Sequence, residues 1–272
     1  MNETNALYQE AMDVLAETSR TFFIPISRLV PGLQEAVASA YLCMRAIDEI
    51  EDDPSLAVEI KVKLLNEISD ILHRPVYEEA LAALLTPYKS VLPEVTLRLA
   101  DWVRFCPLSA SDVVRESTST MARDMAGWVE RDWQVHTKED LDSYTYCVAG
   151  AVGVLLSELW LWHDGTESDY TEAVAFGRGL QTVNILRNRK EDMERGVDYF
   201  PDQWGTEEMF AYTRGNLALA DRYVANLKPG PVFDFCKLPL ALAHGTLSAL
   251  EAGEEKLNRA AVIEIVNQAS AE

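Results

Sequence analysis

Five carboxylates lie within the six residues Asp48–Asp53, directly after an apolar stretch, and they are the first residues of this chain that suggest chemistry. Asp48 and Asp52 are four positions apart, so on a helix they lie on one face and can share a divalent cation. The preceding run Ala36–Met44 is typical of a buried helix. A solvated acidic helix end has the same composition. The choice between these two interpretations therefore depends on whether a second cluster exists.

A second polar cluster follows far downstream, and four of its residues share one helical stripe because they are spaced by three, four and four positions: Gln181, Asn184, Asn188 and Asp192. Carbonyl and carboxylate oxygens of this kind bind Mg²⁺ when phosphate oxygens and water complete the shell. Diphosphate oxygens would be bound by the neighbouring cations Arg187, Arg189, Lys190 and Arg195. Two polar stripes on apolar helices together predict a metal-bound diphosphate above an apolar pocket.

The expected chemistry is the departure of an allylic diphosphate, which needs neutralisation of charge more than transfer of a proton. Metal ions bridged between two carboxylate sets, with arginines around them, supply that neutralisation. An apolar cavity below them would bury a prenyl chain, which contributes roughly 0.8 kcal/mol for each sequestered CH₂. Phe22, Tyr41 and Tyr144 could present their ring faces to the resulting carbocation, or could equally be ordinary core aromatics.

Helical spacing of apolar residues runs through nearly every segment, and this predicts an all-α protein. The expected helices cover residues 5–18, 32–53, 56–72, 76–85, 91–105, 112–135, 138–162, 171–193, 206–226 and 233–266. Between the first two, Ile24–Val30 is expected to be extended or irregular because of Pro25 and Pro31. The small residues Ala149–Gly153 permit close approach of a neighbouring helix or of a ligand tail. No linker divides the chain, so one domain over residues 1–272 is expected.

The composition excludes several classes of function. Asp and Glu number 44 against 24 Lys and Arg, which gives the 272-residue chain a formal charge of −20. Such a surface repels nucleic acid and anionic lipid. The four cysteines lack a CxxC pair and are expected to be reduced core residues. The polar start Met1–Asn5 does not resemble a signal peptide, and the apolar run Cys147–Trp162 is short for a membrane span of about 20 residues. We therefore expect a cytoplasmic protein without a transmembrane segment and with at most peripheral membrane contact.

Other catalytic patterns are weak. The four histidines are scattered, without a Ser or Asp partner at nucleophile spacing, and are expected to be surface or cap residues: His73, His136, His163 and His244. The sequence contains no Gly-rich phosphate loop and no dinucleotide fingerprint, so a reductive step with a nicotinamide cofactor is not indicated.

Taken in order, the motifs between about residues 15 and 205 resemble those of the squalene/phytoene synthase family. They are Ser19–Phe22, Tyr41–Asp53, Tyr144 with Val148–Gly153, Gln181–Arg187, Glu191–Asp192, Arg195–Gly196 and Tyr199–Pro201. The resemblance implies the isoprenoid synthase fold, with helices around a central apolar cavity. It also implies head-to-head joining of two allylic prenyl diphosphates with Mg²⁺ as the cofactor.

The resemblance also implies roles for individual residues. Asp48 and Asp52 would form the first metal motif, and Asn188 with Asp192 the second. Aromatic rings facing the reacting carbons would be Phe22, Tyr41 and Tyr144. Diphosphate would be bound by Ser19, Arg45, Gln181, Asn184, Arg187 and Arg195.

One position departs from the family. The second motif normally begins with Asp directly after the Ile-Leu-Arg segment, and this chain has Asn188 there. An amide oxygen can bind Mg²⁺ but brings no charge. Asn184, Asn188 and Asp192 also look like the Asn/Ser/Glu metal triplet of class I terpene synthases, which ionise one diphosphate.

The departure favours hydrolysis of farnesyl diphosphate to farnesol and diphosphate, as in a bacillus-type farnesyl diphosphatase branch of the family. Three alternatives stay open. The first is head-to-head condensation of two farnesyl diphosphates to a squalene, dehydrosqualene or phytoene type of product. The second is cyclisation of a single substrate by a terpene synthase, and the third is a non-catalytic partner subunit that binds a prenyl lipid.

Overall fold

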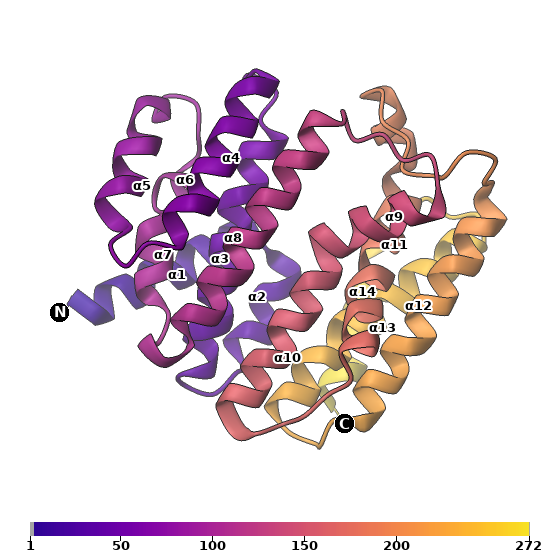
Figure 1. Ribbon diagram of the computed structural model, residues 1–272. Helices are drawn as coiled ribbons and strands as arrows, with labels where there is room; N and C mark the ends of the chain where they lie inside the picture. The colour runs from indigo at the N-terminus through magenta and orange to yellow at the C-terminus, as the bar shows by residue number, and fades with distance from the viewer. Residues whose placement is uncertain (1–2, 272) are drawn as a thin grey trace. The chain divides into compact units, whose positions relative to one another are not determined.

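The structure, a computed structural model, describes the backbone of residues 3–271 and the side chains of residues 5–19 and 21–269. Met1 and Asn2, part of the stretch that was compared with a signal peptide, lie outside the described residues. Within the described part of the chain every regular element is a helix (Figure 1), which confirms the all-α prediction. The chain forms two compact units, Met1–Asp132 and Trp133–Glu272, and each is described by itself. The expectation of one domain around a central apolar cavity stays a prediction.

Unit 1 is organised around α3 (Leu33–Asp52), which contacts α1, α2, α4, α6, α7 and α8. The bounds of the other helices are α1 Glu3–Thr18, α2 Arg20–Ser27, α4 Val58–Leu72, α5 Glu78–Leu85, η1 Thr86–Tyr88, α6 Glu94–Leu97, α7 Leu99–Phe105 and α8 Leu108–Glu130. Gly32 directly precedes α3, and its N–H donates to the Glu35 carboxylate at 2.5 Å. Asp53 directly follows α3 and is extended because proline comes next.

Unit 2 is organised around α11 (Tyr170–Glu194), which contacts α9, the π turn η2, α10, α12 and α13. The bounds of the others are α9 Lys138–Thr145, η2 Tyr146–Gly150, α10 Ala151–Asp164, α12 Thr206–Asn226, α13 Pro231–Glu251 and α14 Arg259–Ala271. α11 begins where the Asp169 carboxylate accepts from the N–H groups of Thr171 and Glu172. An N-cap of this kind satisfies two of the unpaired N–H groups of the first turn.

The backbone of α11 touches the backbones of α10 and of the π turn η2 at two glycines. A Cβ built on Gly153 would lie 2.0 Å from the carbonyl oxygen of Ala173, and one on Gly177 would lie 2.1 Å from that of Ala149. The small residues between Ala149 and Gly153 therefore serve helix packing, one of the two uses left open by the sequence. Because Ala149 is in the π turn, the same contact fixes the irregular part of the helix against α11.

Helix boundaries differ from the sequence expectation at several places. The expected helix 91–105 is divided into α6 and α7, and the expected helix 112–135 already ends at Glu130. Pro25 lies inside α2 and not in an irregular segment, because Ser19 caps a helix short enough to lose only one hydrogen bond at the proline. α8 begins at Leu108, four residues earlier than expected, after Pro107. The expected helix 233–266 is two helices, because the chain turns at Gly253 with a φ of 84°.

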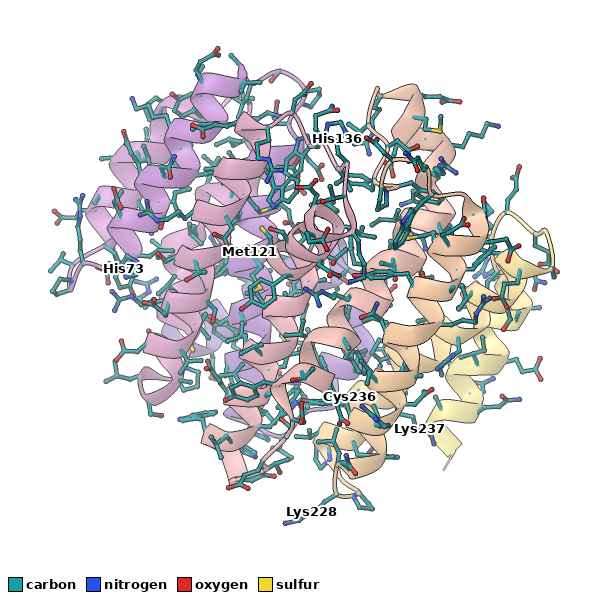
Figure 2. All side chains as sticks on the ribbon, turned by 45° about the vertical axis from the view of Figure 1, so that its right-hand side comes forward. His73, Met121, His136, Lys228, Cys236 and Lys237 are labelled. Carbon is teal, nitrogen blue, oxygen red and sulfur yellow. The ribbon has the colours of Figure 1, made fainter. Side chains whose placement is uncertain are left out.

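The cysteines and the longest apolar helix complete the fold. All four cysteines are free and buried, as expected, and Figure 2 labels Cys236 on α13. Burial raises the pKa of the Cys236 thiol well above its ordinary value. Among the described residues one continuous stretch, Lys138–Asp164, is long and apolar enough to cross a membrane by length and composition, and 39% of its most apolar window is buried. The expected lack of a transmembrane segment therefore stays a prediction.

Candidate functional site

The first predicted stripe lies along α3 as the spacing requires. Tyr41, Arg45 and Asp48 are half-buried and Asp52 is exposed, one above the other over three turns. The positions that hold the helix in unit 1 are apolar and buried, among them Leu42, Cys43, Met44, Ala46, Ile47 and Ile50. Burial of this apolar face fixes the rotation of α3 and thereby presents the polar stripe.

The carboxylates of α3 destabilise one another in their ionised forms. Burial, with the charges of Asp52 and Glu49, raises the pKa of Asp48 to about 7, and Arg45 acts in the opposite direction. Burial, with the charges of Asp52 and Asp48, likewise raises the pKa of Glu51 to about 8. A bound cation would favour the ionised forms of these groups.

Two cations already contact this end of α3. Arg45 donates through Nε and Nη2 to the Glu49 carboxylate one turn away, so in this structure its guanidinium group is paired. The ammonium of Lys61, on α4, donates to the backbone oxygen of Glu51 at 2.5 Å. Sequence reasoning missed Lys61, although it is the first cation after Arg45 and so the first available partner of the acidic run.

The remaining predicted residues of unit 1 lie together at the start of α2 and on α3. The rings of Phe22 and Tyr41 are 6.2 Å apart at 43°. The Ser19 hydroxyl accepts from the N–H of Phe22 at 3.0 Å, and the Tyr41 hydroxyl donates to the backbone oxygen of Thr18 at 3.2 Å. Ser19 therefore has a structural role as a helix cap.

The second predicted stripe lies along α11, and arginines contact the oxygens of two of its four residues. Gln181, Asn184 and Asn188 are half-buried, whereas Asp192 is 6% exposed. The amide oxygen of Asn188 accepts from Nε of Arg187 at 3.1 Å. The carboxylate of Asp192 accepts from Nη2 of Arg195 at 2.5 Å.

Arg189, a candidate for diphosphate binding, is held inside unit 2. Its guanidinium pairs with the Asp198 carboxylate, with Nη2 at 2.8 Å from the oxygen, and lies 3.6 Å from the centre of the Phe200 ring. Phe200 belongs to a motif found in the sequence, but neither it nor Asp198 was assigned a role. Lys190 is exposed on the next position of α11.

Tyr144 on α9 is buried within an aromatic cluster. Its ring stacks on Tyr199 at 4.5 Å and 11°, and meets the Trp133 ring edge-on at 6.0 Å and 77°. One face of the Tyr144 ring is thus covered by Tyr199. The contact connects α9 to the segment that follows α11, which is the part of the chain that carries Asp198 and Phe200.

The two stripes differ in their suitability for a metal ion. Among the residues that the structure describes, no group of three or more His, Cys, Asp and Glu is arranged to hold a metal by itself. Mg²⁺ is often held by only one or two carboxylates plus phosphates and water, and Asp48 with Asp52 supply such a pair. The α11 stripe does not fit as well, because Asn188 is neutral and Asp192 carries an arginine.

His73 has two side-chain partners that the sequence did not reveal. Nε2 of His73, at the end of α4, lies 2.8 Å from the Ser119 hydroxyl, and Nδ1 lies 3.3 Å from the Glu116 carboxylate. This order resembles a hydrolytic triad, but Ser119 is 1% exposed and donates to the backbone oxygen of Ser69 at 3.0 Å. The group therefore connects α4 to α8. In unit 2, His136, which Figure 2 labels, approaches Asp202 at 3.4 Å.

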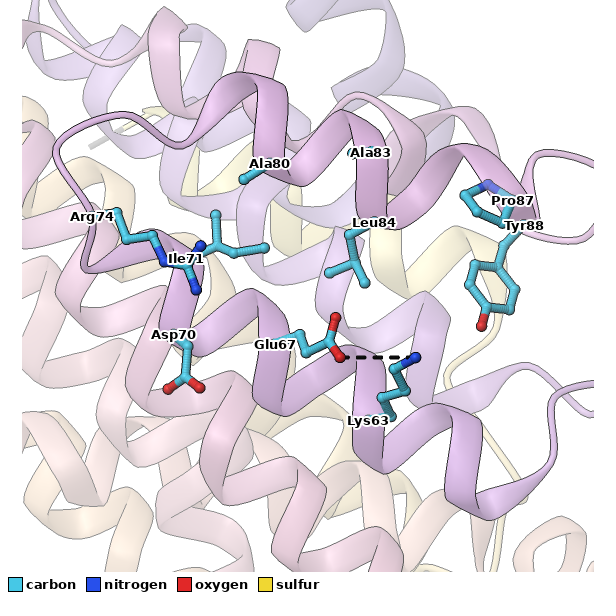
Figure 3. Close-up of a pocket in the computed structure, with 10 residues that line it drawn as sticks. All are labelled: Lys63, Glu67, Asp70, Ile71, Arg74, Ala80, Ala83, Leu84, Pro87 and Tyr88. Atoms are coloured by element: carbon cyan, nitrogen blue, oxygen red, sulfur yellow. Dashed lines mark ion pairs between the residues drawn. The ribbon is translucent and has the colours of Figure 1, made fainter.

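A surface cavity of unit 1 lies apart from the predicted residues. It has a volume of about 600 Å³ and is formed by α4, α5 and η1 (Figure 3). Its lining mixes the Lys63–Glu67 ion pair with the apolar side chains of Ile71 and Leu84. None of the predicted site residues lines it.

Comparisons with known proteins identify the family. The squalene/phytoene synthase model matches residues 15–209, so the chain belongs to that family. The chain is similar to the squalene synthase of Rattus norvegicus, at 28% identity over 264 residues, 86% of this chain and 62% of the relative. It is also similar to the squalene synthase of Dictyostelium discoideum, at 27% identity over 270 residues, which cover 87% of this chain and 62% of the relative. The chain thus spans about 62% of the length of these curated relatives.

Solved structures agree with the sequence comparisons. A complex of TcSQS with the ligand E5700 matches with a TM-score of 0.77 at 25% identity, covering 94% of this chain and 84% of that one. A dehydrosqualene synthase in complex with a ligand matches with a TM-score of 0.63 at 17% identity, covering 99% and 97%, and shows the fold alone. The isoprenoid synthase fold implied by the sequence motifs is therefore confirmed.

Proposed function

We propose that this chain ionises an allylic prenyl diphosphate with the help of Mg²⁺ and condenses two such substrates head to head. The α3 stripe carries this proposal, because Tyr41, Arg45, Asp48 and Asp52 occupy one face of a helix whose other side is buried. Enzymes of the family generally use divalent metal ions with diphosphate substrates. The squalene synthases to which the chain is similar support condensation over hydrolysis, which the sequence alone ranked first.

The residues of α3 would prepare the leaving group. Asp48 and Asp52 would hold Mg²⁺, which when bound supplies positive charge to the departing diphosphate. Arg45 would exchange its Glu49 partner for a phosphate oxygen, since a guanidinium binds phosphate in a fixed geometry. Phe22 and Tyr41 lie close enough to each other to present two rings to the prenyl cation.

The residues of α11 would bind diphosphate through amides and guanidinium groups. Gln181 and Asn184 are half-buried on the stripe, and Arg187 is exposed beside it. In the reaction, one C–O bond breaks to give diphosphate and an allylic cation. The double bond of the second substrate forms a new C–C bond to that cation and a proton is lost, which gives a thirty-carbon alcohol diphosphate. Departure of the second diphosphate and loss of another proton would give a hydrocarbon. We propose no reductive step, since the sequence lacks a dinucleotide fingerprint.

Hydrolysis to farnesol is the second candidate, and Asn188 favours it. A neutral amide in place of a carboxylate suits an enzyme that ionises one diphosphate and lets water capture the cation. We propose a small-molecule prenyl diphosphate as the partner, and the net charge of −20 disfavours nucleic acid as a partner. We also propose a cytoplasmic location.

The products formed from farnesyl diphosphate and Mg²⁺ test the proposal. A thirty-carbon hydrocarbon or alcohol diphosphate in the extract, identified by mass spectrometry, is the expected result. Asp48→Asn should lower the rate at least about 100-fold because a charged ligand is lost. Glu59→Gln, an exposed carboxylate on α4, is the matched control and should retain the rate. Farnesol as the main product would support hydrolysis instead, and no turnover would support a binding subunit.

A further inference from the structure

At the end of α11 an arginine is paired with a buried carboxylate. Asp192 is 6% exposed, and a buried carboxylate without a positive partner is strongly unfavourable. Its partner in this structure is Arg195, three residues later, with Nη2 at 2.5 Å from the carboxylate oxygen. The ion pair therefore already supplies the charge that a metal at Asp192 would bring.

The backbone holds Arg195 in place for this contact. The N–H of Val197 donates to the oxygen of Asp192, and the N–H of Gly196 donates to the oxygen of Met193, both at 3.0 Å. These two bonds form a Schellman motif, with Gly196 in the left-handed conformation at a φ of 86°. Arg195 is thus the C-cap residue of a defined turn, and its positive charge lies at the negative end of the helix dipole.

The neighbouring residues also favour an anion over a divalent cation. From Gln181 to Arg195 the chain has four cationic and three anionic side chains, although the whole protein carries a charge of −20. Asn188 adds an oxygen without charge, and its amide already accepts from Arg187. Arg189, a third cation of this part of α11, is paired with Asp198 and lies over the ring of Phe200.

We propose that the α11 cluster binds diphosphate directly, through Arg195 and Arg187, and takes no metal ion of its own, with Arg195 in the place that a metal would have at Asp192. This inference rests on the proposed function, because it assigns diphosphate as the ligand. It restricts the metal of the proposed enzyme to the carboxylates of α3. The side chain of Arg195 is 66% exposed, so phosphate oxygens can reach its guanidinium group from solvent.

Counting bound Mn²⁺ in the full chain tests the inference without relying on turnover. The protein is equilibrated with Mn²⁺ and inorganic diphosphate, and bound Mn²⁺ is measured by electron paramagnetic resonance. Asp192→Asn should leave the number of bound ions unchanged, whereas Asp48→Asn should lower it. The double variant Asn188→Asp with Arg195→Met should gain one ion, because it exchanges the internal cation for a second carboxylate. Arg214→Met, which removes an exposed arginine paired with Glu251 on another face of unit 2, is the control.

The outcomes separate this inference from the function on which it rests. Loss of one bound ion in Asp192→Asn, with the parent protein binding Mn²⁺, would overturn the inference alone. A parent protein that binds no Mn²⁺ would overturn the proposed function as well. Without metal, Arg195→Met should weaken binding of inorganic diphosphate by about tenfold or more, as expected for a charge-assisted hydrogen bond. Equal diphosphate affinity of Arg195→Met and Arg214→Met would contradict direct binding by Arg195.

Discussion

Replacement of Gly177 by alanine should separate α11 from the π turn η2 and destabilise unit 2. The added Cβ would lie 2.1 Å from the Ala149 oxygen and 2.5 Å from the Ala149 carbonyl carbon. Ordinary contact begins at 3.4 Å, so the oxygen distance is 1.3 Å too short. Both partners are backbone, and a backbone cannot rotate away as a side chain can.

The expected magnitude follows from two opposing effects. Glycine to alanine inside a helix stabilises it by about 1 kcal/mol when the methyl group meets nothing. Forcing extra volume into a closed contact typically costs about 1–3 kcal/mol, and backbone overlap belongs at the upper end of that range. Gly177→Ala should therefore lower the free energy of unfolding by about 2 kcal/mol.

A control in the same unit isolates the contact. Gly215 lies inside α12, and a Cβ built there meets no atom within 4 Å. Gly215→Ala should gain up to about 1 kcal/mol, so the two variants should differ by about 3 kcal/mol in urea unfolding. Gly153→Ala acts on the adjacent contact, between α10 and α11, so the double variant should lose less than the sum of the single losses. Equal stability of Gly177→Ala and Gly215→Ala would refute the close contact between these backbones.

Other predictions concern ionic contacts and a turn. Burial alone would raise the pKa of Asp142, but hydrogen bonds from Lys138 and Tyr212 lower this pKa below its ordinary value of 3.8. The ionised Asp142 therefore stabilises the fold above pH 3.8, and this stabilisation is lost when the pH falls below that value. Acid unfolding followed by circular dichroism should therefore show a weaker pH dependence for Asp142→Asn than for the parent, and an unchanged profile would contradict this. Lys61→Met should lower the melting temperature, because the contact of Lys61 with the backbone oxygen of Glu51 near the end of α3 is lost. Lys63→Met, which removes an exposed lysine of the same helix, is the control, and equal melting temperatures of the two variants would exclude a capping role of Lys61. Gly196→Ala should lower the free energy of unfolding by about 1 kcal/mol, since a φ of 86° strains any residue with a Cβ. A denaturation midpoint at or above that of the parent would contradict the left-handed conformation of this residue.

The two polar stripes were predictable because they depend only on spacing along a helix. The burial of Leu42, Ile47 and Ile50 follows from the same apolar period, so the direction in which α3 presents Asp48 and Asp52 could be read from the sequence. The resemblance of the motifs then led to the family, which the match over residues 15–209 confirms.

Contacts between distant segments could not be predicted in the same way. The pairs Arg189–Asp198 and Lys61–Glu51 depend on how the chain turns after a helix, and many cations were equally available as partners. The contact of His73 with Ser119 joins residues 46 positions apart, so no local spacing indicates it. Helix α2 was not predicted for a different reason. Pro25 indicated an irregular segment, but in this short helix the cap at Ser19 outweighs the tendency of proline to end a helix.

The occupancy of the α11 oxygens by arginine is the feature that most affects the proposed chemistry. Sequence reasoning recognised that Asn188 removes a charge, and it assigned Asp192 to a metal. In the structure Asp192 is paired with Arg195. The products show whether the enzyme joins two substrates despite this change. A mixture of labelled and unlabelled substrate distinguishes joined products from single ones.

The protein should be incubated with Mg²⁺ and an equimolar mixture of unlabelled and fully deuterated farnesyl diphosphate, and the extracted products weighed by mass spectrometry. Head-to-head condensation predicts thirty-carbon products with no, one or two labelled halves, the mixed product being the most abundant. Products that contain only a single farnesyl unit, labelled or unlabelled and never mixed, would contradict the condensation proposed for this chain.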